Sequence, residues 1–174
     1  YFAKDINEKR SELIAKMVGE ALDIKFEKTD SVLEALILEA ELIKKHQPKY
    51  NSAGKDQKSW NYVVITKEDF PRVLVIRERE LAQVQEDFLE KFGPFTNGGQ
   101  LRIALKIIRK IFPFRDRCNI GETKGCFNYQ IGLCPGTCIN KVSESEYKKT
   151  IKNIILLFKG KKGVLITGLE KEMK

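Results

Sequence analysis

Four cysteines are the residues of this 174-residue chain best suited to specific chemistry. Successive cysteines are separated by seven, seven and three residues, and no other cysteine occurs. The loop that carries them is rich in glycine, which lets the backbone adopt positive φ and turn each thiol inward. Four thiolates gathered in this way can hold one metal ion or one iron–sulfur cluster. The candidate ligands are Cys118, Cys126, Cys134 and Cys138.

Two other interpretations of the cysteines stay open. Two disulfides would require an oxidising compartment, and the rest of the chain, which is long enough for an ordinary core, contains no cysteine at all. Free thiols without a ligand are the third interpretation. The clustering favours a cysteine-ligated centre over both.

The charge of the chain indicates the kind of partner. Lys and Arg number 32 against 24 Asp and Glu, which gives a net charge of +8. This excess favours a polyanion, and nucleic acid above all, although a merely soluble basic protein has the same composition. No apolar run is long enough to span a membrane and no signal-type segment is present, so we expect a cytoplasmic protein without membrane contact. Because the first residue is Tyr1 and not Met, we expect a cut, processed or incompletely recorded chain.

The elements that must position these residues follow from apolar periodicity. Two capping-box signatures, Ser31 with Glu34 and Ser143 with Glu146, mark the starts of helices. Residues 55–59 are predicted as a polar loop, and the turn-rich segment 92–99 as a connector near a domain boundary. The predicted helices cover 7–20, 31–46, 101–112 and 143–160, and the predicted strands 22–26, 60–66 and 72–76.

Basic residues form a stripe on the helix predicted before the cysteine loop. Helical periodicity places four of them on one side, and two more lie beside the first cysteine. Such a stripe can contact the phosphates of a DNA backbone, and a solvated helix face is the alternative. The candidate DNA-binding residues are Arg102, Lys106, Arg109, Lys110, Arg115 and Arg117.

One carboxylate could hold a divalent cation. Glu39 lies one position off the apolar face of the helix predicted over 31–46, where it could point across a cleft. A single Glu on an amphipathic helix is usually a solvated residue. His46, the one histidine, suits the helix C-terminus because of the helix dipole.

Six segments in the same order resemble the UvrC family, the excinuclease subunits of bacterial nucleotide excision repair, which carry a GIY-YIG nuclease domain. The resemblance covers essentially the whole chain. The segments are 34–51, the loop at 55–59, FPRV at 70–73, FGPF at 92–95, IFPFR at 111–115, and CFNYQIGLC at 126–134 followed by Cys138.

The resemblance implies roles for particular residues. Glu39 would be the sole protein ligand of a catalytic Mg²⁺ or Mn²⁺, and Asn51 would support that site. The four cysteines would bind a 4Fe-4S cluster, with Zn²⁺ as the alternative that the same thiol set allows. The parent protein would incise damaged double-stranded DNA by metal-dependent hydrolysis with a UvrB-type partner. The strands that bear the catalytic Tyr and Arg would lie upstream of Tyr1, so we expect this chain alone to be inactive.

These inferences combine into an α+β fold. We expect a partial GIY-YIG nuclease domain with its following strands over 1–96, a helical cysteine-cluster region over 97–160, and the start of a UVR-type helix, which docks the partner, over 161–174. Two rivals are a non-catalytic nucleic-acid-binding module with a structural zinc and a scaffold that binds only proteins.

Overall fold

The computed structural model describes residues 12–51, 60–81, 83 and 87–173. These residues form a three-stranded antiparallel sheet with helices packed against it, which confirms the predicted α+β class. The predicted loop at 55–59 and the start of the helix predicted over 7–20 lie outside the described residues. Within them, no helix is long and apolar enough to cross a membrane.

The sheet has the order β2-β1-β3, with β1 (Asn61–Thr66) in the centre. Its β-branched residues Val63, Val64 and Ile65 are fully buried, which suits a central strand. β2 (Val73–Arg77) and β3 (Phe88–Phe95) flank it, both antiparallel. The strands predicted over 60–66 and 72–76 are thereby confirmed.

Two predictions about the backbone are wrong. Residues 92–95, predicted as a connector, are the end of β3: Phe92 pairs with Val63 and its ring stacks on Phe158 at 5.0 Å between centroids. The strand predicted over 22–26 does not form. Alternating apolar residues form a strand only when another strand pairs with them, and among the described residues none pairs with this segment. Leu22 and Phe26 are therefore exposed.

The long helices begin where capping residues occur. In α3 (Val32–His46), the Ser31 hydroxyl accepts from the Glu34 N–H, although the Glu34 carboxylate accepts from the Asp30 N–H and so forms no reciprocal box. In α7 (Glu144–Phe158), both halves of the predicted capping box at Ser143 are present. α5 (Gly98–Ile111) begins three residues earlier than predicted because Asn97 caps it.

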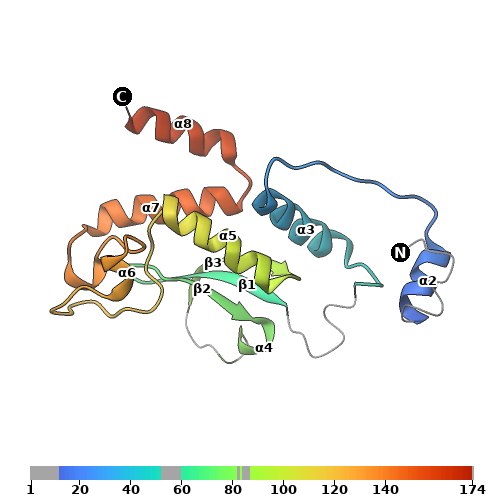
Figure 1. Ribbon diagram of the computed structural model, residues 1–174, viewed down its shortest axis with the longest axis horizontal. Helices are drawn as coiled ribbons and strands as arrows, with labels where there is room; N and C mark the ends of the chain where they lie inside the picture. Colours follow the sequence, from blue (N-terminus) through green and yellow to red (C-terminus); the bar gives the residue numbers. More distant parts are fainter. Residues whose placement is uncertain (1–11, 52–59, 82, 84–86, 174) are drawn as a thin grey trace.

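α3, α5 and α7 cover one face of the sheet and enclose the core (Figure 1). Leu101 and Ile108 of α5 pack with Ile154 of α7 and with Val63 and Phe95 of the sheet in one buried cluster. The predicted boundary between residues 96 and 97 falls between β3 and α5, and this cluster contains residues from both sides of it.

Four shorter or peripheral helices complete the described fold. α8 (Lys162–Glu172) packs on α7 and buries Leu165, while Lys162 pairs with Asp30 and Glu34 at the start of α3. The cysteine loop, with α6 (Phe127–Gln130) and the 3-10 turn η2 (Thr137–Ile139), lies at one end of the molecule (Figure 1). The remaining two are α2 (Glu12–Glu20) and α4 (Glu78–Leu81).

Candidate functional site

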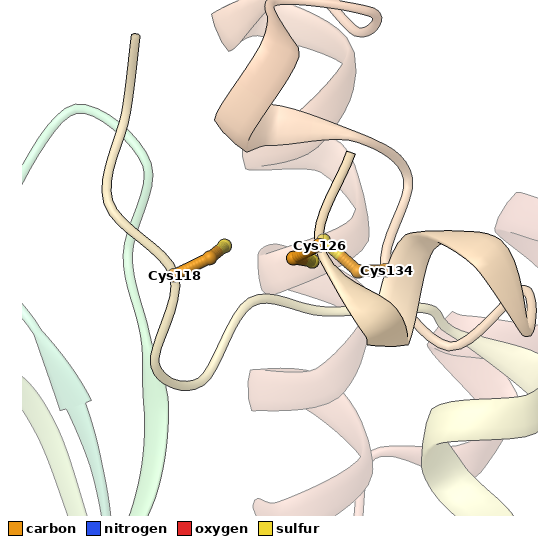
Figure 2. Close-up of side chains that lie close together, drawn as sticks. All are labelled: Cys118, Cys126 and Cys134. Carbon is orange, nitrogen blue, oxygen red and sulfur yellow. The ribbon is translucent and has the colours of Figure 1, made fainter. Parts of the chain in front are cut away.

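Three of the four cysteines converge. The Sγ atoms of Cys118, Cys126 and Cys134 lie within 4.8 Å of one another, and Figure 2 shows the side chains directed toward a common point. Cys126 immediately precedes α6 and Cys134 follows it, so this short helix holds both thiols against the segment that carries Cys118. Cys134 is buried and the other two are half-buried.

The fourth cysteine lies beside this group and not within it. Cys138, in η2, is fully buried, and its Sγ accepts a hydrogen bond from the Cys126 N–H at 3.5 Å. All four cysteines are free thiols in the structure. Within the described residues, the three convergent cysteines are the one set of three potential metal-ligating side chains found close together.

Two glycines let the loop close over the ring of Tyr129. A Cβ added at Gly125 would lie 2.4 Å from that ring. At Gly136 the backbone has φ +88° and an added Cβ would lie within 3.0 Å of both Tyr129 and Lys141. Any side chain at either position would displace the ring or strain the backbone, so these two glycines are needed for the loop geometry.

Burial raises the pKa of the Cys118 thiol to about 12, and the neighbouring Cys134 sulfur adds to the effect through charge repulsion. The Cys118 thiol therefore does not ionise readily by itself in this environment. A bound cation would reverse that preference, because metal ligation requires the thiolate and releases its proton.

Arg115 joins the cysteine loop to the sheet. Its side chain is 7% exposed, and its Nη1 lies 2.7 Å from Glu68 Oε2 in the turn between β1 and β2. Its Nε donates to the Cys118 carbonyl at 2.7 Å. Its backbone N–H donates to the buried Tyr147 hydroxyl, which in turn donates to the Pro71 carbonyl. These bonds fix the position of the first cysteine relative to the core.

Arg109 holds the loop against α5 in a similar way. Its guanidinium donates to Asp116 Oδ2, to the Leu133 carbonyl and to the Phe114 carbonyl, each at 2.8 Å, and lies over the Phe114 ring. Asn128 of α6 donates to the other oxygen of Asp116 at 3.0 Å. One arginine thus connects α5 to both sides of the cysteine cluster.

Two residues of the predicted DNA-binding set make internal contacts. Arg109 and Arg115 use their guanidinium groups for internal bonds, which gives each a structural role, and phosphate contact by either stays a prediction. Helical periodicity places Arg109 in the stripe but cannot show that its partners lie in the following loop. The cations that remain exposed are Arg102, Lys106, Lys110 and Arg117. Three of these, all but Lys110, line a groove of about 500 Å³ between β2 and α5.

The predicted nuclease residues share a second groove. Glu39 and Asn51 both line a cavity of about 680 Å³ along α3 and the segment after it, together with His46. Glu39 is exposed, and its Oε1 accepts a hydrogen bond from Thr96 Oγ1 at 2.8 Å. The structure therefore brings Glu39 and Asn51 to one site, 12 positions apart in the chain.

Sequence reasoning missed several residues that support these sites. Glu68 is 47 residues from Arg115, and the Thr137 hydroxyl lies close to two cysteine sulfurs. No periodic pattern signals a long-range ion pair. Only the position of Thr137 in the sequence, between Cys134 and Cys138, indicates that it lies near the cysteine cluster.

Two models of UvrC-family domains match this chain. Residues 1–52 match the model of the UvrC-like GIY-YIG domain, and residues 60–157 match that of the middle domain of the UvrC/Cho excinucleases. Both models name UvrC, and they match consecutive parts of this chain. No solved structure matches the chain.

Curated relatives agree with this class. The chain is 39% identical over 176 residues to UvrABC system protein C of Trichormus variabilis, which covers 100% of this chain and 27% of that protein. It is 40% identical over 162 residues to UvrABC system protein C of a Synechococcus strain, covering 92% of this chain and 26% of the relative. This chain belongs to the UvrC family, and it spans about a quarter of the length of these relatives.

Proposed function

We propose that this chain is part of an endonuclease subunit that incises damaged double-stranded DNA in nucleotide excision repair, acting with a UvrB-type partner. The consecutive match to both family models carries the proposal. The relatives' name, UvrABC system protein C, supports action within a multi-subunit system. α8 lies where the resemblance puts the beginning of the partner-binding helix. The free thiols fit a reducing, cytoplasmic compartment.

Glu39 and Asn51 are the proposed nuclease residues of this chain. Glu39 would hold the catalytic Mg²⁺ or Mn²⁺, which when bound neutralises the charge that develops on the phosphate during hydrolysis. The hydrogen bond from Thr96 orients the carboxylate, and Asn51 faces the same groove. The remaining catalytic groups implied by the resemblance do not occur among these residues, so we do not expect the 174-residue chain to cleave DNA by itself.

Cys118, Cys126, Cys134 and Cys138 would hold the metal centre. The resemblance favours a 4Fe-4S cluster, in which each thiolate binds a different iron. A single Zn²⁺ is the alternative, because the same four thiolates would satisfy its coordination. Three of the four sulfurs lie within 4.8 Å of one another, which supports a common centre of either kind. A structural zinc would also suit the second candidate function, a non-catalytic nucleic-acid-binding module.

The exposed cations Arg102, Lys106, Lys110 and Arg117 would contact the DNA backbone. α5 contains no acidic residue, so no carboxylate of this helix repels phosphates that approach its exposed side. Because phosphate contacts carry no base information, this binding would be independent of sequence. The metal centre would keep the loop beside these cations in one conformation.

A graft into a relative tests the nuclease proposal. The matching segment of the Trichormus variabilis protein is replaced by this chain, and incision of damaged plasmid is measured in the presence of UvrA and UvrB subunits. We expect the graft to incise, Glu39→Gln to abolish incision, and the control Glu41→Gln, an exposed residue of the same helix, to retain it. A folded graft whose incision survives Glu39→Gln would contradict the assigned role.

A further inference from the structure

Thr137 has an unusual position for a hydroxyl. It belongs to the 3-10 turn η2, between Cys134 and Cys138, and its side chain is completely buried. Its Oγ1 lies 3.7 Å from Cys134 Sγ and 3.9 Å from Cys118 Sγ. The hydroxyl therefore faces two of the three sulfurs that converge in the cysteine cluster.

The partners of this hydroxyl define its chemistry. A buried hydroxyl needs a hydrogen-bond partner to offset the cost of leaving water. In the described part of the chain, the partners of Thr137 Oγ1 are the two sulfurs. A neutral thiol is a weak acceptor, whereas a thiolate accepts a stronger, charge-assisted hydrogen bond. The hydroxyl is therefore stabilised most when at least one of these sulfurs carries negative charge, as a metal ligand does.

The residue that precedes α6 supplies a second donor. The Cys126 N–H donates to Cys138 Sγ at 3.5 Å, and the single O–H of Thr137 can donate to the sulfur of either Cys134 or Cys118. Donors of this kind orient metal ligands and withdraw charge from them. The backbone donor cannot be removed by a side-chain substitution, but the hydroxyl can.

We propose that Thr137 is a positioning residue of the metal centre, whose hydroxyl donates a hydrogen bond to a metal-bound sulfur of Cys118 or Cys134. This inference rests on the proposed cysteine-ligated centre and names a residue that tunes it. With a single ion, the bond favours the thiolate and so strengthens metal binding. With an iron–sulfur cluster, withdrawing charge from the sulfur also favours the reduced state.

Variants of Thr137 can separate a role of its hydroxyl from a role of its packing. Thr and Val have nearly the same shape, so Thr137→Val removes the hydroxyl and keeps the packing. Thr137→Ser keeps the hydroxyl and removes a methyl group. Thr137→Ser and Thr137→Ala also differ by the hydroxyl alone. If Thr137→Val does not fold, the comparison of these two variants replaces that of the parent with Thr137→Val.

The test is Zn²⁺ affinity, measured on the reduced, metal-free 174-residue protein by competition with a chromogenic chelator. We expect Thr137→Val to bind Zn²⁺ about 10-fold to 100-fold more weakly than the parent, the range found for outer donors of metal ligands. Thr137→Ser should remain within about threefold, given the normal scatter of such effects. If the protein purifies with a cluster, Thr137→Val should have a lower reduction potential than the parent, because the hydrogen bond that favours the reduced state is lost.

Three results would overturn the inference, and they separate it from the underlying proposal. Equal Zn²⁺ affinities in the parent, Thr137→Val and Thr137→Ser would reject the role of the hydroxyl while the centre stands. Weak binding by Thr137→Ser with parent-like binding by Thr137→Val would assign Thr137 to packing. A parent that binds Zn²⁺ no better than Cys118→Ser and purifies without metal would reject the centre and the inference together.

Discussion

Glu68 and Arg115 form an ion pair, with Glu68 Oε2 and Arg115 Nη1 2.7 Å apart, that joins the turn after β1 to the cysteine loop. Glu68 also accepts hydrogen bonds from Thr66, at the end of β1, and from Arg72, just before β2. Because Arg115 in turn donates to the carbonyl of Cys118, the carboxylate acts through one arginine on the first candidate metal ligand.

Removing the charge of Glu68 should therefore destabilise the fold. We expect Glu68→Gln to lower the free energy of unfolding by about 2 kcal/mol, because hydrogen bonds to a charged group are weakened and Arg115 stays buried. The exposed neighbour Asp69 supplies the control: Asp69→Asn should change stability by less than about 0.5 kcal/mol. Urea unfolding followed by circular dichroism measures both. Equal stability of the two variants would show that the ion pair is not stabilising.

The same carboxylate makes stability depend on pH. Burial alone would raise the pKa of Glu68, but hydrogen bonds from Thr66, Arg72 and Arg115 outweigh it and hold the pKa below its usual 4.5. A lowered folded-state pKa stabilises the fold above the unfolded-state value, and the contribution is lost as pH falls through the folded-state value. The stability difference between parent and Glu68→Gln should thus be complete at pH 7 and shrink below about pH 4.5. A difference that is constant from pH 7 to pH 3 would contradict this.

Neighbouring cations of α5 should respond differently to truncation. Arg109→Ala removes three hydrogen bonds, one of which is also the ion pair with Asp116, from a side chain that is 12% exposed, so we expect a loss of about 3 kcal/mol in unfolding free energy. Lys110→Ala, one residue further along the helix, should cost less than about 0.5 kcal/mol. Thermal and urea unfolding of the two variants decides between a structural and a solvated Arg109. If both variants unfold like the parent, the internal role of Arg109 is wrong.

DNA affinity should depend on the exposed cations. Lys106→Glu should weaken binding to duplex DNA severalfold and reduce the slope of log affinity against log salt by about one, since one phosphate contact is lost. Lys152→Glu, an exposed lysine of α7, makes the same charge change away from the groove and serves as the control. Fluorescence anisotropy at several salt concentrations measures both. If the two variants bind alike, net charge alone accounts for DNA binding and the α5 groove has no special part.

The sequence predicts those features that depend on local signals. Ser31 and Ser143 mark the starts of α3 and α7 because capping acts within one helical turn. The clustering of Cys118, Cys126 and Cys134 in the chain also indicates that their sulfurs can converge. β3 escapes prediction because its Gly93 and Pro94 are typical turn residues, and only pairing with β1 shows that they belong to a strand.

Long-range contacts explain the remaining differences. Arg115 looks like a free cation next to the first cysteine, but its partners Glu68 and Phe70 are more than 40 residues away. Leu22 and Phe26 alternate like strand residues, yet alternation does not supply a neighbouring strand. Features that require a second segment of the chain are therefore the ones that only the structure reveals.

Above all, we propose that the four cysteines hold a metal centre that organises this part of a UvrC-family protein. The most direct measurement is the iron, sulfide and zinc content of the chain purified without oxygen, together with its absorption spectrum. We expect either about four iron and four sulfide per chain with a brown colour, or about one zinc per chain, and the loss of that metal in Cys118→Ser. Colourless protein that contains neither metal and retains four free thiols would contradict it.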